Sequence, residues 1–317
     1  MSDDVNITSI FNNFKQDCRD FLIELFNDFI KTQNIEITKH SKEYLKDADY
    51  KDLLKCYIYN MQRLPCGKKA VYYSKEILKS KLYKAFKKKI DNIQKCFEKG
   101  SSILPYLSTH SNHLTYNDYM LNDWGIIHLH IHPLDKRTKY NDNFLLFTYV
   151  WGNNVFFLDV RNHSNFADKD LLDILDRNWQ GLLDGCSLKG IPLSEEIAKQ
   201  DIISMRKSKI IYPIVVNNKS CTPQIFQETK RMLYAIAIDK ILYNLAYAIS
   251  SCKDKLQEAV IKQGKEDIVN IHITFDRQNS KIICYDSNSS IGFHFENNDE
   301  LFSDLIDNLK YYGLFPL

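Results

Sequence analysis

Glycine is scarce in this chain, with 10 residues in 317, whereas aromatic side chains are abundant, with 19 tyrosines and 18 phenylalanines. A disordered or low-complexity chain has the opposite composition, because it lacks the apolar side chains that would repay the entropy of folding. The composition therefore excludes both classes. We expect an ordered protein nearly throughout.

The sequence also lacks an uninterrupted apolar run. Its longest apolar stretch, residues 232–249, contains Asp239, Lys240 and Asn244. A membrane-spanning helix needs about 20 residues with few or no charges. We therefore predict a buried helix here and no membrane partner.

Several sequence motifs are missing. The eight cysteines form no CxxC pair, and the Met-Ser-Asp-Asp start does not resemble a signal peptide. This cysteine usage is typical of the reducing cytoplasm, which is the localisation we predict, with the thiols mostly buried. A P-loop, a GxGxxG sequence and a GxSxG elbow are absent as well. Phosphate-cradling, dinucleotide-binding and serine-hydrolase functions are correspondingly disfavoured.

The hydrophobic periodicity changes along the chain from helical to alternating and predicts an α+β protein. We expect a helical region at 1–100, a three-stranded antiparallel meander with covering helices at 101–185, and an α+β module at 186–317. The expected helices are 7–32, 42–61, 68–97, 116–121, 169–179, 195–205, one from Pro223, and 299–312; the expected strands are 125–133, 143–150, 155–161, 210–216, 267–275, 281–286 and 291–295.

Positive charge is concentrated in the third predicted helix. Residues 68–99 contain 11 lysines and 3 carboxylates, a net charge of +8, so the rest of the chain sums to −6. One interpretation is contact with nucleic-acid phosphates, with Lys81, Lys84 and Lys88 on the helix and Lys136 and Arg161 beyond it. The other is an ordinary solvated helix face.

Three histidines alternate with aliphatic residues in the stretch His128-Leu-His130-Ile-His132. Alternation is the period of a β-strand, so the three rings should share one face, roughly 6.5 to 7 Å apart. The helix at 169–179 should cover the other face and leave the histidine face free for a site. Further polar residues lie near the ends of the same meander: Lys136, Arg137, Asp159, Arg161 and His163.

Three interpretations of these residues remain open. In the first, histidines act as general base and general acid in phosphodiester cleavage, and Arg137 or Lys136 stabilises the developing charge. RNA is then the favoured substrate, because its 2′-hydroxyl is an internal nucleophile and no cofactor is needed. In the second, His128 and His130 bind Zn²⁺ or Mn²⁺, with Asp159, His132 or His163 as a further ligand. In the third, the histidines are structural.

The segment from Asp118 to His130, together with 143–147, 155–160, His163 and Asn178-Trp179, resembles an uncharacterised bacterial family with a DWGI-H-LH core. More loosely, the element order over residues 68–180 is similar to the RelE/ParE toxin superfamily, several members of which are ribosome-dependent endoribonucleases. This resemblance implies a ribonuclease site at His128, His130, Arg137 and His163. The chain differs in its length, its large C-terminal module and its histidines on the first strand.

The leading prediction is a cytoplasmic, metal-independent endoribonuclease of toxin or phage-defence type that uses His128, His130, His132, Arg137 and His163. A metal-dependent hydrolase or nuclease is the second prediction. The third is a non-enzymatic nucleic-acid-binding or sensor protein. A regulatory, antitoxin-like protein is the partner expected for residues 186–317.

Overall fold

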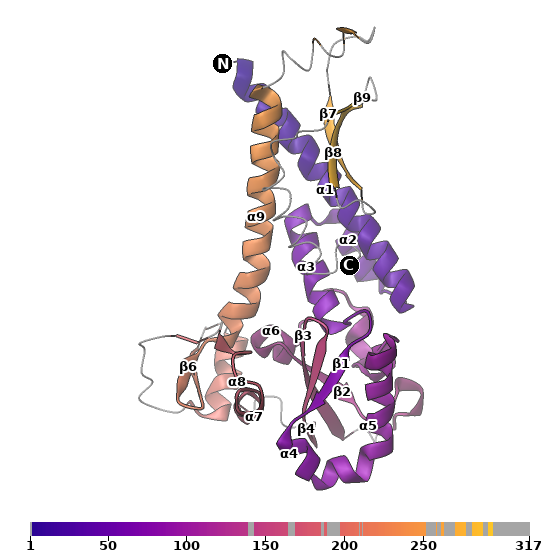
Figure 1. Ribbon diagram of the computed structural model, residues 1–317, viewed down its shortest axis with the longest axis vertical. Helices are drawn as coiled ribbons and strands as arrows, with labels where there is room; N and C mark the ends of the chain where they lie inside the picture. Colours follow the sequence, from indigo (N-terminus) through magenta and orange to yellow (C-terminus); the bar gives the residue numbers. More distant parts are fainter. Residues whose placement is uncertain are drawn as a thin grey trace. The chain divides into compact units, whose positions relative to one another are not determined.

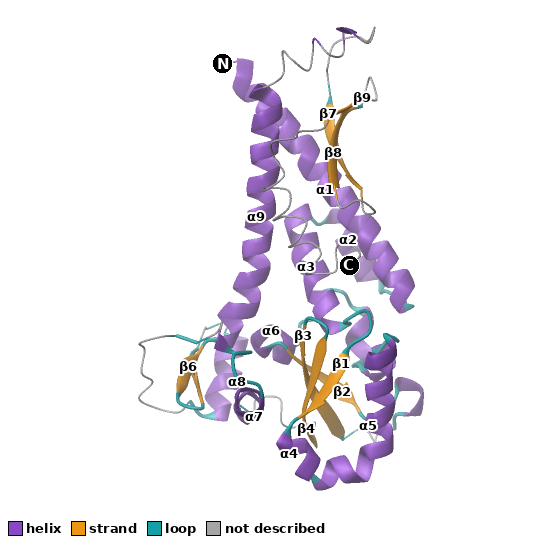
Figure 2. Cartoon of the chain, viewed as in Figure 1, coloured by secondary structure: helices purple, strands orange, loops and turns teal. Residues whose placement is uncertain are grey.

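The fold is seen in a computed structural model (Figures 1 and 2). The described residues are 2–138, 143–163, 169–184, 187–188, 197–208, 210, 212–251, 258, 261–262, 270–276, 281–287 and 291–293. Helices and strands follow one another as the α+β prediction requires, and that class is confirmed. Contacts group the chain into two units: unit 1 is 1–32, 42–58 and 232–317, and unit 2 is 33–41 and 59–231. Whereas consecutive modules were predicted, residues 1–100 contribute to both units.

Unit 1 combines N-terminal helices with a C-terminal sheet. Its elements, some of which extend into unit 2, are α1 (Ser2–Gln33), α2 (Lys39–Asp47), α3 (Tyr50–Arg63), α9 (Pro223–Ser251), β7 (Ile271–Asp276), β8 (Lys281–Asp286) and β9 (Ile291–Phe293). The strands form one antiparallel sheet in the order β7-β8-β9. Helix α1 contacts both α9 and the sheet. Phe11 meets Tyr243 of α9 edge to face at 5.5 Å, and Phe21 stacks on Phe275 of β7 at 4.3 Å.

Several sequence predictions in unit 1 need adjustment. The helix predicted at 42–61 is two helices, α2 and α3, separated at residues 48–49. Helix α9 begins at Pro223 and β8 spans Lys281–Asp286, as predicted. The helix predicted at 299–312 lies outside the described residues. Among the described helices, none combines the length and apolar character needed to cross a membrane.

Unit 2 is built on a four-stranded sheet, drawn in orange in Figure 2. Its strands, in the spatial order β1-β4-β3-β2, are β1 (Ala70–Tyr73), β4 (Asn154–Asn162), β3 (Phe144–Trp151) and β2 (Ile126–His130). The predicted antiparallel meander of β2, β3 and β4 is present. Strand β1 runs parallel to β4 and was not predicted. The other helices of unit 2, including short 3₁₀ turns, are α4 (Lys75–Lys79), α5 (Lys81–Lys99), η1 (Leu104–Tyr106), η2 (Thr109–Asn112), α6 (Tyr119–Trp124), η3 (Leu134–Lys136), α7 (Asp170–Asn178) and α8 (Lys199–Lys207).

The single helix predicted at 68–97 is wrong, because this stretch forms β1, α4 and α5. Two serines with extended backbone explain the breaks. The Ser74 hydroxyl donates to the Leu158 carbonyl (2.6 Å) and accepts from the Ile77 amide (2.9 Å), so it links β4 to the first turn of α4. Ser80 caps α5 in the same way by accepting from the Tyr83 amide. Serine competes well for such positions because its hydroxyl replaces a missing helical partner.

Helix α5 packs on one face of the sheet, here called the α5 face. Directly opposed residues of neighbouring strands share a face, so the pairing of Thr148 with Phe157 and with Ile127 assigns these residues to it. Phe97 of α5 lies 6.1 Å from the ring of Phe157. The buried residues of α5, which turn toward the sheet, are Tyr83, Ile90, Ile93 and Phe97.

The opposite face, here called the histidine face, carries His128 and His130 and is covered by α7. Its apolar residues form one core with those of α6 and α7: Met120, Trp124, Ile126, Leu145, Phe147, Leu158, Leu171, Leu172 and Leu175. The prediction that this face is left free is therefore wrong. Both faces of the sheet carry large apolar side chains, and each is covered by an amphipathic helix.

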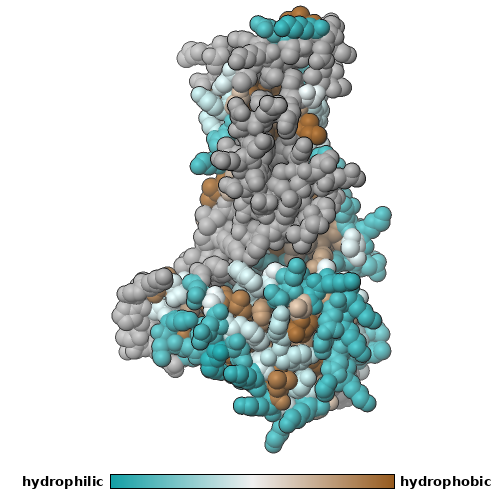
Figure 3. All heavy atoms as spheres, in the orientation of Figure 1, coloured by the Kyte–Doolittle hydropathy of each residue, from teal (hydrophilic) through white to brown (hydrophobic). Residues whose placement is uncertain are grey.

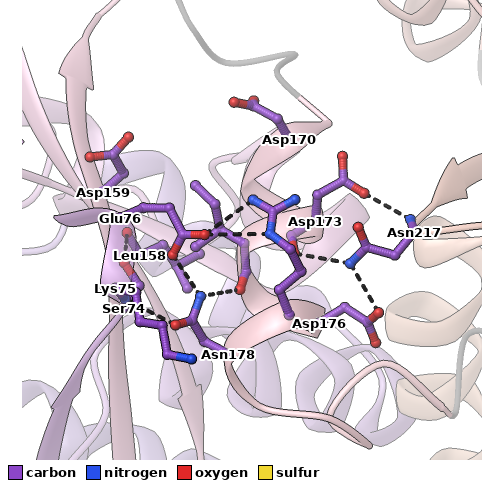
Figure 4. Close-up of polar contacts among 12 residues, drawn as sticks. Ser74, Lys75, Glu76, Leu158, Asp159, Asp170, Asp173, Asp176, Asn178 and Asn217 are labelled. Atoms are coloured by element: carbon purple, nitrogen blue, oxygen red, sulfur yellow. Dashed lines mark hydrogen bonds and ion pairs between the residues drawn. The ribbon is translucent and has the colours of Figure 1, made fainter. Parts of the chain in front are cut away.

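A polar network holds α7 over the histidine face (Figure 4). On one side, Asn178 accepts from the Lys75 amide (2.9 Å) and donates to Glu76 (2.7 Å). On the other side, Asn217 donates from its backbone to Asp173 (2.9 Å) and from its side chain to Asp176 (3.0 Å). Asn217 and the next residue have positive φ, as a tight turn requires, and join β5 (Ile214–Val216) to β6 (Lys219–Cys221).

Candidate nucleic-acid interface and histidine cluster

Three histidines converge at one end of the histidine face. The rings of His128 and His130 lie 6.3 Å apart, centroid to centroid, and His163, directly after β4, lies 5.9 Å from His130. His128 and His130 are 8% and 4% exposed, whereas His163 is an exposed residue. We call His128, His130 and His163 the histidine cluster. It runs from the interior of unit 2 to its surface.

Asp118 anchors the buried end of the cluster. Its Oδ1 accepts from the amides of Met120 (3.0 Å) and Leu121 (3.2 Å) and so caps α6, while its Oδ2 lies 3.2 Å from Nδ1 of His128. Burial lowers the pKa of His128. The Asp118 carboxylate opposes this effect, and the nearby charges of His163 and Arg137 add to it. His128 is therefore held as a neutral imidazole at pH 7.

His132 does not join the cluster, contrary to the prediction that the three alternating rings share a face. Strand β2 ends at His130, and beyond that point the alternation no longer governs side-chain direction. The His132 ring lies edge to face with Phe86 of α5, at 6.3 Å, and its Nε2 contacts the Lys89 ammonium. His132 therefore belongs to the α5 side of the sheet.

Arg137 braces the loops beside the cluster. Its Nε donates to the His132 carbonyl (2.9 Å) and its Nη2 to the Pro105 carbonyl (2.7 Å). These bonds fix the turn after β2, and the charge of Arg137 still reaches His128 electrostatically. Lys136, the preceding residue, is exposed on η3. Both side chains thus lie on the same edge of unit 2 as the cluster.

Arg161 and Asp159 neutralise each other. Arg161 Nε donates to Asp159 (2.9 Å), and its Nη1 donates to Asp170 of α7 (2.6 Å). A guanidinium that faces two carboxylates attracts a phosphate weakly, so the predicted phosphate contact through Arg161 is not favoured.

The ligand set proposed for a metal is not assembled either. Asp159 pairs across the sheet with Phe147, and Phe147 pairs with His128, so Asp159 and His128 lie two strand spacings apart, roughly 9.5 Å. Within the described residues, three or more His, Cys, Asp or Glu side chains do not gather as a metal ion requires. The described cysteines are all free thiols: Cys18, Cys56, Cys66, Cys96, Cys221 and Cys284.

The lysines of α5 gather on its outer side. At 100° per residue, Lys81, Lys84, Lys88, Lys95 and Lys99 fall within an arc of about 60°, and all five are exposed. We call these five residues the lysine stripe. Figure 3 shows hydrophilic side chains over the part of the surface where Figure 1 draws α4 and α5.

Other lysines of the same helix have partners. Lys87 pairs with Asp91 at 2.9 Å, and Lys89 contacts His132. Both lie beside the stripe rather than on it. For the five stripe lysines, the described part of the chain offers no carboxylate in ion-pair contact. The stripe is therefore a row of uncompensated positive charge.

Sequence reasoning missed Asp118 and the residue that holds it. The Tyr59 hydroxyl donates to the Tyr116 carbonyl (2.7 Å) and accepts from the Asp118 amide (3.0 Å), so α3 positions the loop before α6. Asp118 fell inside the helix predicted at 116–121, whereas α6 begins one residue after it. The preference of aspartate for the position before the first helical residue was the available signal. The contact with Tyr59 had no local signal.

Comparison with protein-family models, with curated proteins and with solved structures gave no match to this chain.

Proposed function

We propose that this chain is a nucleic-acid-binding protein and that its contact surface is the lysine stripe on α5. The stripe supports the proposal because five exposed ammonium groups lie on one side of one helix without a compensating carboxylate among the described residues. Nucleic acid is the polyanion whose regular charge spacing suits such a row.

Binding of nucleic acid through the stripe should weaken steeply as the salt concentration rises. Each neutralised phosphate releases condensed counterions, so five contacts give a slope of log K against log [salt] of about −4.5 for duplex DNA and about −3.5 for a single strand. A chain that binds by shape or by apolar contact alone has a shallow slope. Salt dependence therefore distinguishes this mechanism.

A matched pair of variants tests the proposal. Lys84→Gln, Lys88→Gln and Lys95→Gln together remove three stripe charges, whereas Lys31→Gln, Lys42→Gln and Lys46→Gln remove three exposed charges elsewhere. Fluorescence anisotropy with labelled oligonucleotides between 50 and 300 mM KCl, roughly the range in which phosphate contacts are titrated, measures both. We expect the first set to lower the slope by about 2.7 and the control set to leave it unchanged. Equal behaviour of the two sets overturns the proposal.

A second candidate function is RNA cleavage of toxin or phage-defence type at the histidine cluster. The observation that favours it is the series from Asp118 through His128 and His130 to the exposed His163, because the ring at its surface end can reach a substrate and imidazole suits acid–base chemistry near neutral pH. In this reaction a neutral imidazole takes the proton of the 2′-hydroxyl, whose oxygen attacks phosphorus. A protonated imidazole gives its proton to the departing 5′-oxygen. The products are a 2′,3′-cyclic phosphate and a 5′-hydroxyl.

His163→Gln tests this second candidate, and His132→Gln is its matched control, since His132 lies outside the cluster. Incubation of the purified protein with labelled RNA in EDTA should give cleavage that His163→Gln abolishes and His132→Gln retains. Intact RNA with the native chain rules it out under these conditions. Activation by added Zn²⁺ or Mn²⁺, with bound metal found by elemental analysis, would favour the metal-dependent hydrolase instead.

A further inference from the structure

We infer that the ligand of the lysine stripe is a double-stranded nucleic acid, bound through phosphates on both sides of one groove; this inference rests on the proposed function. The stripe divides into two groups along the helix axis. At 1.5 Å per residue, Lys81, Lys84 and Lys88 span about 10.5 Å, and Lys95 and Lys99 span about 6 Å. The interval from Lys88 to Lys95 is also about 10.5 Å.

This interval matches a groove of a double helix. The major groove of B-form DNA is about 12 Å wide, and phosphates line both of its edges. Two short side chains border the stripe within the interval: Asn92, which is exposed and uncharged, and Asp91, whose carboxylate is paired with Lys87. A short polar side chain flanked by two lysine groups suits a position over the groove, with each group on the phosphates of one strand.

The chemistry of α5 disfavours a single strand. Proteins that bind single strands usually stack the bases on exposed aromatic rings. The aromatic residues of α5 are turned inward: Tyr83 and Phe97 are buried, and Phe86 packs against Phe144 at 5.3 Å. The stripe itself therefore contains charge without a stacking surface.

The rigidity of α5 points the same way. The helix is capped at both ends, by the Ser80 hydroxyl and by Gly100, whose amide donates to the carbonyls of Cys96 and Phe97. Its inner side is anchored to the α5 face through Ile90 and Ile93. A straight row of charges fixed in this way matches the regular phosphates of a double helix and gains less from a flexible strand.

The test measures binding of the full chain to four labelled probes of equal length: duplex DNA, duplex RNA and the corresponding single strands. We expect duplex affinity to exceed single-strand affinity on the order of tenfold at physiological salt, because a duplex presents phosphates on both sides of the interval. The two duplex arms identify which helix form is bound. Equal or tighter binding of single strands overturns the duplex inference and leaves the proposed function standing, whereas absence of binding to every probe overturns both.

Paired variants test the contact across the groove. Lys84→Gln with Lys88→Gln removes charge from one group, and Lys95→Gln with Lys99→Gln removes it from the other. Each pair should reduce the salt slope for the duplex by about 1.8. If one pair has this effect and the other has none, the duplex does not contact both groups, and the inference fails. Far-ultraviolet circular dichroism of each variant checks that α5 remains helical.

Discussion

The carboxylate of Asp118 has two separable roles, and two substitutions distinguish them. Oδ1 accepts from two amides at the start of α6, and Oδ2 lies 3.2 Å from Nδ1 of His128. Asp118→Asn retains an oxygen that can cap the helix but removes the negative charge. Asp118→Ala removes both the cap and the charge.

The expected magnitudes follow from these contacts. Loss of a helix cap costs about 1 kcal/mol, so Asp118→Ala should be less stable than Asp118→Asn by about that amount. The charge acts on His128, whose pKa the carboxylate raises against the lowering effect of burial. In both variants the pKa of His128 should therefore fall further below its ordinary value.

Two measurements check these expectations. Urea unfolding followed by tryptophan fluorescence reports on unit 2 alone, because Trp124, Trp151 and Trp179, the three tryptophans of the chain, all belong to it. Titration of the labelled histidines by NMR gives the pKa of His128 directly. Equal stability of the two variants would refute the capping role, and an unchanged pKa of His128 in Asp118→Asn would refute the electrostatic coupling.

Three further predictions concern the stability of unit 2, measured by the same unfolding assay. Gly100 and Gly67 both have positive φ, but a Cβ on Gly100 would lie 2.9 Å from the Gly67 backbone, whereas a Cβ on Gly67 would meet nothing within 4 Å. Gly100→Ala should therefore lower the free energy of unfolding by about 1–3 kcal/mol more than Gly67→Ala does. Equal losses would contradict the close approach. Ser74→Ala removes a buried hydroxyl that bonds to two backbone groups and should lower the free energy of unfolding by about 2 kcal/mol. Ser80→Ala removes a single helix cap and should lower it by about 1 kcal/mol. The reverse order would contradict the double hydrogen-bonding role of Ser74. Because the pKa of His128 is lowered in the folded state, the unfolded chain binds more protons, so the unfolding free energy should fall as the pH drops below about 6.5, by at most about 1.4 kcal/mol per pH unit from this residue. His128→Asn should reduce that slope, while His40→Asn, an exposed control, should retain it; identical slopes in all three proteins would exclude His128 as the source.

The meander was predictable because its signal is local. Strands β2, β3 and β4 alternate or continue as apolar runs, and they pair with their neighbours in sequence. Strand β1 was not predictable in this way. Its four residues, Ala70–Tyr73, lie in a lysine-rich stretch, and their partner β4 follows some 80 residues later in a parallel pairing.

The burial of the histidine face could have been anticipated from the helices. Helices α5 and α7 each have one apolar side, and each apolar side needs a surface to cover. One sheet offers two faces, so two such helices leave neither face open. The alternation of the histidines, taken alone, indicated a shared face but contained no information on what covers it.

The direction of His132 depended on where β2 ends, and strand ends are the least certain feature of any periodicity.

The two candidate surfaces lie on opposite sides of one sheet, and this separates the two proposed activities. The lysine stripe is on the outer side of α5, whereas His128 and His130 are under α7. A ligand on the stripe is thus not in contact with the cluster. Binding should survive the loss of His163, and a cleavage defect in His163→Gln should appear without a change in affinity.

At the β2 edge of the sheet, one short stretch of chain links the two sides of unit 2. Strand β2 is an edge strand, and directly after it the chain passes from His130 on the histidine face to His132 on the α5 side, where Lys89 contacts it. A ligand that served both surfaces would have to pass this edge. Lys89→Gln is then the informative variant. If RNA is cleaved at the cluster after binding on the stripe, this substitution should slow cleavage more than it weakens binding, because Lys89 contacts His132 at this edge and is not one of the stripe lysines. Weaker binding with an unchanged rate of cleavage would mean that the two surfaces act on separate ligands.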